Sequence, residues 1–158
     1  MTSPPLKFIV LVVEDSDSKR QSIQSVLERE IPGVKIHHAI SVKSGIDAVL
    51  TLAPDFIIAD MSLPTFDIKN RERGGTPRPF GGFDIFETLD RHGIVVPVLV
   101  VTSYESITDG ENSMGISELK NHLERDYPAI FNGIVHFDSI YATWEHKLSA
   151  FLKNSNGM

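Results

Sequence analysis

An apolar run that ends in a carboxylate constrains the fold of this chain more than any other feature. The residues of 56–59 are all apolar, Asp60 follows directly, and Pro64 interrupts the chain four positions later. Short apolar runs that contain β-branched residues are typical of strands buried on both faces, as in a parallel sheet. We therefore expect a buried strand over residues 56–59 that places Asp60 at the rim of the sheet.

Similar runs recur along the chain and alternate with segments of helical periodicity. They predict further strands over residues 8–13, 34–39, 95–101 and 133–137. The first helix is expected to begin at Ser16, Asp17 or Ser18, and the second at Ser41 or Ser44, because such side chains cap helices. Alternation of strand and helix predicts an α/β fold. We expect a single flavodoxin-like doubly wound domain, with five parallel strands in the order 2-1-3-4-5 and helices on both faces.

Length and pattern favour one domain with two long connections. The chain has 158 residues, which suits a single core. We expect the domain to span 6–152, with long insertions at about 65–82 and 104–115, and residues 153–158 to form a tail. Connections of this length are uncommon in compact domains and are often functional.

Composition excludes several classes of function. The net charge of -6 argues against a nucleic-acid surface. The absence of cysteine excludes a disulfide framework and thiolate metal sites. No apolar run approaches the roughly 20 residues that span a bilayer, and the start of the chain lacks the pattern of a signal peptide. The expectation is a cytoplasmic protein that binds neither nucleic acid nor membrane.

Polar residues cluster where the predicted strands end. Glu14 and Asp15 follow the first strand, Asp60 the third, and Thr102 the fourth. In the expected strand order these ends are adjacent. Two carboxylates about 4 Å apart repel by ~4 kcal/mol at an effective dielectric of about 20, so such a cluster calls for a cation, and oxygen ligands suit Mg²⁺. The alternative is that Asp15 or Asp17 only caps a helix and that Thr102 is an ordinary hydroxyl at a strand end.

Four motifs together resemble the receiver domain of two-component response regulators. The resemblance extends over about residues 6–152, and its motifs stand in order at the strand ends and in the last helix. They are Val12-Val13-Glu14-Asp15, Asp60-Met61-Ser62-Leu63-Pro64, Val100-Val101-Thr102-Ser103 and Ala142-Thr143-Trp144-Glu145-His146-Lys147-Leu148.

The resemblance implies a role for each matching residue. Asp60 would be the phosphoacceptor, and Thr102 would bond a phosphoryl oxygen. Glu14, Asp15, Asp60 and the backbone carbonyl of Ser62 would hold Mg²⁺. A histidine kinase or phosphotransfer protein would donate the phosphoryl group, and an unknown output protein would receive the signal. The chain would be an enzyme only in the sense of self-catalysed phosphoryl transfer and autodephosphorylation.

The fifth strand departs from the family pattern. The family has a lysine after this strand, whereas an ungapped alignment from the last helix places Phe137 there, between His136 and Asp138. Loss of one electrostatic donor in such a site typically costs about 10²–10³ in rate. A receiver with slow phosphorylation and a pseudo-receiver that binds partners without phosphorylation are therefore both open.

Three arginines in the first insertion offer one replacement for this lysine. Arg71, Arg73 or Arg78 could fold over the acidic site, or the basic loop could simply be solvated.

Two other functions fit the residues poorly. Phosphatases with an aspartate nucleophile usually have a second aspartate two residues on, where this chain has Ser62. Flavin binding needs a loop that accepts a phosphate group after the first strand, and the acidic residues 14–17 would repel it.

Overall fold

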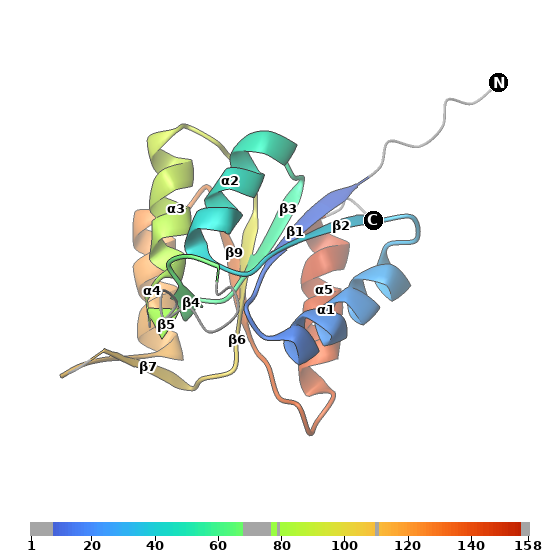
Figure 1. Ribbon diagram of the computed structural model, residues 1–158. Coiled ribbons are helices and arrows are strands. Elements are labelled where there is room, and N and C mark those ends of the chain that lie inside the picture. The colour runs from blue at the N-terminus through green and yellow to red at the C-terminus, as the bar shows by residue number, and fades with distance from the viewer. Residues whose placement is uncertain (1–7, 68–76, 79, 110, 156–158) are drawn as a thin grey trace.

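A five-stranded parallel sheet forms the centre of the molecule (Figure 1). The computed structural model describes residues 8–67, 77–78, 80–109 and 111–155. The strands of the sheet are β1 (Ile9–Val13), β2 (Lys35–Ala39), β3 (Phe56–Ala59), β6 (Val98–Thr102) and β9 (Phe131–His136). Their order is β2-β1-β3-β6-β9, and every adjacent pair is parallel. Counted as five strands, this is the predicted order 2-1-3-4-5, so the predicted fold is confirmed.

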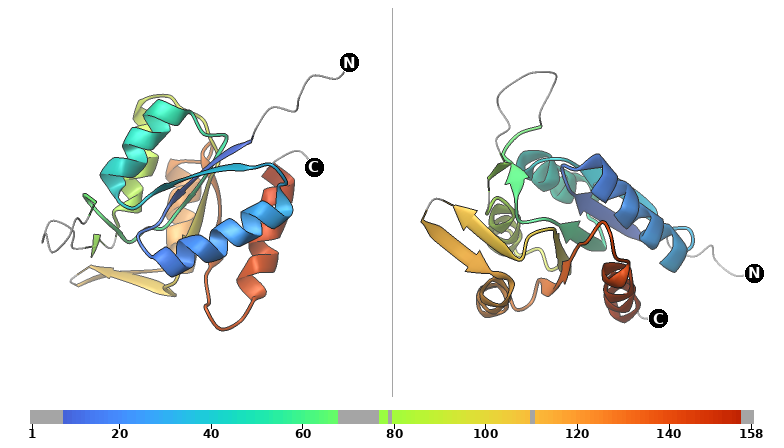
Figure 2. Two further views of the ribbon diagram at one scale, coloured as in Figure 1. Left: turned by 45° about the vertical axis from the view of Figure 1, so that its right-hand side comes forward. Right: turned by 90° about the horizontal axis from the view of Figure 1, so that it is seen from below.

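Helices cover both faces of the sheet, which gives three layers (Figures 1 and 2). The helices are α1 (Asp17–Glu30), α2 (Val42–Leu52), α3 (Gly82–Arg91), α4 (Ile116–Asp126) and α5 (Thr143–Ser155). Helices α1 and α5 share one hydrophobic cluster with the sheet, whereas α2, α3 and α4 share the other. None of the helices in the described ranges is long and apolar enough to cross a membrane.

The residue types explain why these elements form. All residues of β3 and β6 are buried, as continuous apolar runs require. Helix α1 is capped by Ser16, whose hydroxyl accepts the Lys19 amide. Helix α2 is capped by Ser41 in a reciprocal arrangement with Ser44. These caps fix where each helix begins after its strand.

Strand β6 begins later than predicted. The apolar run starts at Val95, but the strand begins at Val98. Pro97 has no amide hydrogen to donate to a ladder, and its carbonyl accepts the Ile57 amide instead. Helix α5 in turn continues to Ser155, beyond the expected end of the domain.

A pair of short antiparallel strands lies at each of the two predicted insertions. The first is bounded by β4 (Leu63–Pro64) and β5 (Pro77–Arg78), which pair with each other. The second contains β7 (Ser106–Asp109) and β8 (Asn112–Gly115), where we expected only a long connection. Figure 2 shows that both pairs lie at the end of the sheet where the parallel strands terminate. Domain limits of 6–152 stay a prediction.

Helix α3 approaches the chain after β3 very closely. The Gly82 amide donates to the Met61 carbonyl at 2.8 Å. A Cβ atom on Gly82 would lie 2.6 Å from the Asp60 carbonyl oxygen and 2.8 Å from the Met61 Cα. Such distances are shorter than real contacts, so glycine at this position lets α3 pack against the residues that follow Asp60.

We expect Gly82→Ala to destabilise the protein by about 1–3 kcal/mol, because the added methyl group meets backbone atoms that cannot move independently. Urea denaturation measures the change. Gly115→Ala is the matched control, because a Cβ there meets no atom within 4 Å; it should cost less, up to about 1 kcal/mol, because Gly115 is the N-cap of α4 and alanine caps more weakly than glycine. Equal effects of the two substitutions would contradict the role of Gly82.

Candidate functional site

Asp60 lies where β3 ends and is almost completely buried, with 5% of its surface exposed. Its backbone amide donates to the Val13 carbonyl of β1 at 3.2 Å. Its Oδ1 atom accepts the Met61 amide at 2.7 Å and, more weakly, the Ser62 amide at 3.4 Å. The sheet and the following turn therefore hold one oxygen of the carboxylate and leave Oδ2 free to meet another group.

Glu14 is the second buried carboxylate and lies beside Asp60. Its amide donates to the Ala39 carbonyl, and its Oε1 accepts the Ser16 amide at 3.1 Å. Its carbonyl accepts a hydrogen bond from the Arg20 guanidinium at 2.8 Å. The Glu14 side chain is thus fixed by the turn between β1 and α1, which aims it at the end of β3.

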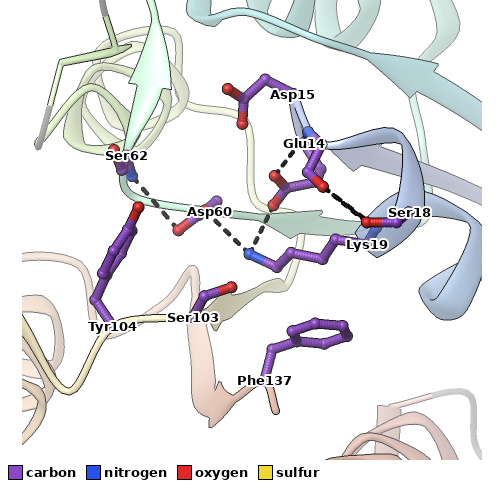
Figure 3. A pocket seen from close by; sticks show the side chains of 10 residues that line it. Glu14, Asp15, Ser18, Lys19, Asp60, Ser62, Ser103, Tyr104 and Phe137 are labelled. Atoms are coloured by element: carbon purple, nitrogen blue, oxygen red, sulfur yellow. Dashed lines mark hydrogen bonds and ion pairs between the residues drawn. The ribbon is translucent and has the colours of Figure 1, made fainter. Parts of the chain in front are cut away.

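The ammonium of Lys19 lies between the two carboxylates (Figure 3). Its Nζ is 2.7 Å from Glu14 Oε2 and donates to Asp60 Oδ2 at 3.0 Å. It also donates to the Val101 carbonyl at 2.8 Å. The Lys19 ammonium forms an ion pair with Glu14 Oε2, and this oxygen has no further hydrogen-bond donor in the described part of the chain. Lys19 is 3% exposed, so water screens these charges little.

Lys19 was not predicted as a site residue, although the sequence carries a signal for it. The buried residues of α1 are Lys19, Ile23, Val26 and Leu27. They recur at the spacing of one helix face, so the lysine occupies the first position of the apolar stripe. A lysine is almost never fully buried unless it is paired, and its place on this stripe points to a charge partner in the interior.

The remaining predicted ligands line the same pocket but differ in exposure. The pocket has a volume of about 310 Å³, and Glu14, Asp15, Asp60 and Ser62 all line it. Asp15 is exposed. Within the described residues, no three acidic or histidine side chains are close enough to form a metal cage by themselves. The predicted carboxylates therefore share a pocket without forming a compact trio.

Thr102 lies at the end of β6 and is completely buried. Its hydroxyl oxygen accepts the Tyr104 amide at 3.2 Å. It does not line the pocket, whereas its neighbours Ser103 and Tyr104 do. In this structure the hydroxyl stabilises the turn after β6.

Phe137 follows β9 and lines the pocket opposite the carboxylates. Its amide donates to the Thr102 carbonyl at 2.7 Å. The Lys19 Nζ lies 5.8 Å from the centroid of its ring, within the range of a cation–π interaction. The ring also packs against Trp144 of α5, with the centroids 4.8 Å apart.

The three arginines of the first insertion cannot be placed at the site. Arg71 and Arg73 lie outside the described residues, and only the backbone of Arg78 is described, paired with Leu63. That one of these arginines replaces the family lysine stays a prediction.

The donor set of the pocket fits a hard divalent cation. Two buried carboxylates share a single ammonium, so the group of three carries a net negative charge when both are ionised. Glu14 Oε2 has the Lys19 ammonium at 2.7 Å and no further donor among the described residues, so it keeps a lone pair that can accept a metal ion. Mg²⁺ usually binds through one or two carboxylates and keeps several waters, so a compact trio of carboxylates is not required.

Burial raises the pKa of Glu14 from 4.5 to about 8; the charge of Asp60 adds to the rise, and Lys19 opposes it. The folded protein therefore binds more protons than the unfolded chain between these two pH values. The contribution of Glu14 to the free energy of unfolding is fully present below pH 4.5 and is lost as the pH rises towards 8.

We expect the free energy of unfolding, measured with a chelator present, to fall from pH 5 to pH 8, and Glu14→Gln to reduce this fall because glutamine does not titrate. Urea denaturation at several pH values measures both slopes. Glu118→Gln, at an exposed position of α4, is the control and should leave the slope unchanged. A slope in Glu14→Gln equal to that of the wild type would show that Glu14 does not titrate in this range.

Comparison with known proteins finds matches along most of the chain. The sequence model of the response regulator receiver domain matches residues 10–120. The chain is 27% identical over 141 residues to the Detocs response regulatory protein DtcB of Enterobacter cloacae, covering 88% of this chain and 94% of that protein. It is 23% identical over 154 residues to DtcB of Vibrio alginolyticus, covering 92% of this chain and all of that protein.

Solved structures show the same fold. The response regulator domain of Thermotoga maritima CheB superposes with a TM-score of 0.62 at 17% identity, covering 96% of both chains. A response regulator receiver domain protein from Clostridium thermocellum gives a TM-score of 0.61 at 18% identity, covering 95% of this chain and 94% of that one. The strand order, the acidic residues at the strand ends and the family match lead to one conclusion: this chain belongs to the response regulator receiver domain family.

Proposed function

We propose that this chain is a phosphoacceptor receiver of a phosphorelay, phosphorylated on Asp60 in a Mg²⁺-dependent reaction. The observation that carries the proposal is a buried aspartate at the end of β3 that opens into a pocket and has an ammonium 3.0 Å from its outer oxygen. An aspartate in this position can act as a nucleophile, and the positive charge beside it can stabilise charge on a transferred group.

The phosphoryl group would come from a phosphohistidine of a histidine kinase or phosphotransfer protein. An oxygen of Asp60 attacks phosphorus, the new oxygen–phosphorus bond forms, and the nitrogen–phosphorus bond of the donor breaks. The electron pair leaves with the imidazole nitrogen, which takes a proton from solvent. Water later attacks the acyl phosphate, restores the Asp60 carboxylate and releases inorganic phosphate.

Glu14, Asp15, Asp60 and the backbone carbonyl of Ser62 would hold Mg²⁺. When bound, the metal neutralises charge on the phosphoryl oxygens. The Met61 amide keeps Asp60 Oδ1 in place during the attack, at 2.7 Å. Thr102 would turn its hydroxyl from its present role at the Tyr104 amide to bond a phosphoryl oxygen.

The relatives support a signalling role. The proteins from Enterobacter cloacae and Vibrio alginolyticus are named as response regulatory proteins. By analogy, this chain would act in the cytoplasm and pass its state to a partner protein through a surface that changes on phosphorylation.

A pseudo-receiver that binds partners without phosphorylation is the second candidate. The observation that favours it is the ion pair at the site, since Asp60 Oδ2 already has a positively charged partner. Such a protein would use the same fold, and Asp60 would have a structural role.

We expect incubation with Mg²⁺ and acetyl phosphate to add the mass of one phosphoryl group to the wild type and nothing to Asp60→Asn, because the amide is not a nucleophile. Intact mass spectrometry measures the addition. Asp47→Asn, at an exposed position of α2, is the matched control and should be labelled like the wild type. A wild type that stays unlabelled, together with full activity of Asp60→Asn in cells, would favour the pseudo-receiver.

A further inference from the structure

We propose that Lys19 of α1 is the phosphoryl-binding cation of this chain and replaces the lysine that receiver domains have after the last strand of the sheet. This inference rests on the proposed function, because it assigns a role in the same reaction. Lys19 lies on α1, whereas the family pattern places the lysine after the last strand of the sheet.

The position after β9 cannot supply this charge. Phe137 stands there, its ring lines the pocket, and His136 and Asp138 flank it. Among the described residues that line the pocket, Lys19 is the single lysine or arginine. A phosphoryl group on Asp60 would therefore have this one ammonium as its basic neighbour in the described part of the chain.

The distances suit the role. The Lys19 Nζ is 3.0 Å from Asp60 Oδ2 and 2.8 Å from the Val101 carbonyl. A phosphorus atom bonded to Asp60 carries its oxygens only one bond further out. A lysine side chain has rotatable bonds and three donor hydrogens, so Nζ can follow the charge from the carboxylate to a phosphoryl oxygen.

The surroundings hold the ammonium at the site. The Lys19 backbone lies in the first turn of α1, whose N-cap is Ser16. Its side chain is buried, and the Phe137 ring, which occupies the position of the family lysine, lies beside its ammonium. The aromatic ring at 137 thus supports the relocated charge through a cation–π interaction.

In the reaction, Lys19 forms no covalent bond. While the bond from Asp60 to phosphorus forms and the bond from phosphorus to the leaving group breaks, the ammonium attracts the oxygens that carry the charge. Before the reaction it instead forms ion pairs with Glu14 and Asp60, and there it competes with a divalent cation. Removal of the Lys19 ammonium should therefore weaken the binding of a phosphoryl mimic and tighten the binding of Mg²⁺. A purely structural role would not produce these opposite effects.

The test compares the binding of Mg²⁺ alone and of beryllofluoride with Mg²⁺, a mimic of the phosphorylated aspartate, by calorimetry and ¹⁹F NMR. For Lys19→Met we expect beryllofluoride binding to weaken by about 10²–10³-fold, and Mg²⁺ binding to tighten by about tenfold or more. Lys43→Met, at an exposed position of α2, is the control and should change both affinities less than twofold.

A second variant moves the charge to the family position. Lys19→Met combined with Phe137→Lys should regain most of the beryllofluoride binding. In the wild type, labelled with ¹⁵N-lysine, the Lys19 ammonium resonance should shift when beryllofluoride and Mg²⁺ bind. This readout holds even if a Lys19 variant, checked by circular dichroism, does not fold.

The outcomes separate the two proposals. Beryllofluoride binding by the wild type with an unshifted Lys19 resonance, or with a folded Lys19→Met that binds equally well, overturns the role of Lys19 and leaves the receiver function intact. A wild type that binds no beryllofluoride and accepts no phosphoryl group from acetyl phosphate overturns both.

Discussion

The structure depends on one ammonium that lies between two buried carboxylates and forms an ion pair with each. Glu14 and Asp60 come from neighbouring strands and are both excluded from solvent. Without a cation between them, the two carboxylates would repel each other in a site that water screens little. Removal of one partner from a buried group of charges is strongly destabilising, typically by about 3–5 kcal/mol. Lys19 therefore stabilises the metal-free site.

This arrangement joins the site to α1. The ammonium that pairs with Asp60 comes from α1 and not from the segment after β9. Helix α1 packs beside α5 and shares a hydrophobic cluster with it. The Phe137 ring contacts both the ammonium and Trp144. The side chains of Lys19 and Phe137 thus connect Asp60 to the helical layer formed by α1 and α5.

Much of this architecture could be predicted from the sequence because the relevant signals are local. Continuous apolar runs identified the buried strands, and the residues after them identified Glu14, Asp15 and Asp60 as pocket residues. The β7–β8 pair was missed because its strands are short and weakly alternating, although Gly110-Glu111, which separates them in the sequence, has the glycine-first pattern of a two-residue hairpin loop. Lys19 was missed because lysines are usually exposed, and only the folded chain shows that its side chain reaches β3.

The short connection between β1 and α1 has a consequence for how such chains can diverge. Only residues 14–16 separate the strand from the helix. Successive residues in a helix are turned by about 100° from one another, so one inserted residue would rotate position 19 away from the interior. The length of this turn is therefore constrained as strictly as the identity of the lysine. A longer turn would therefore remove the Lys19 ammonium from Glu14 and Asp60.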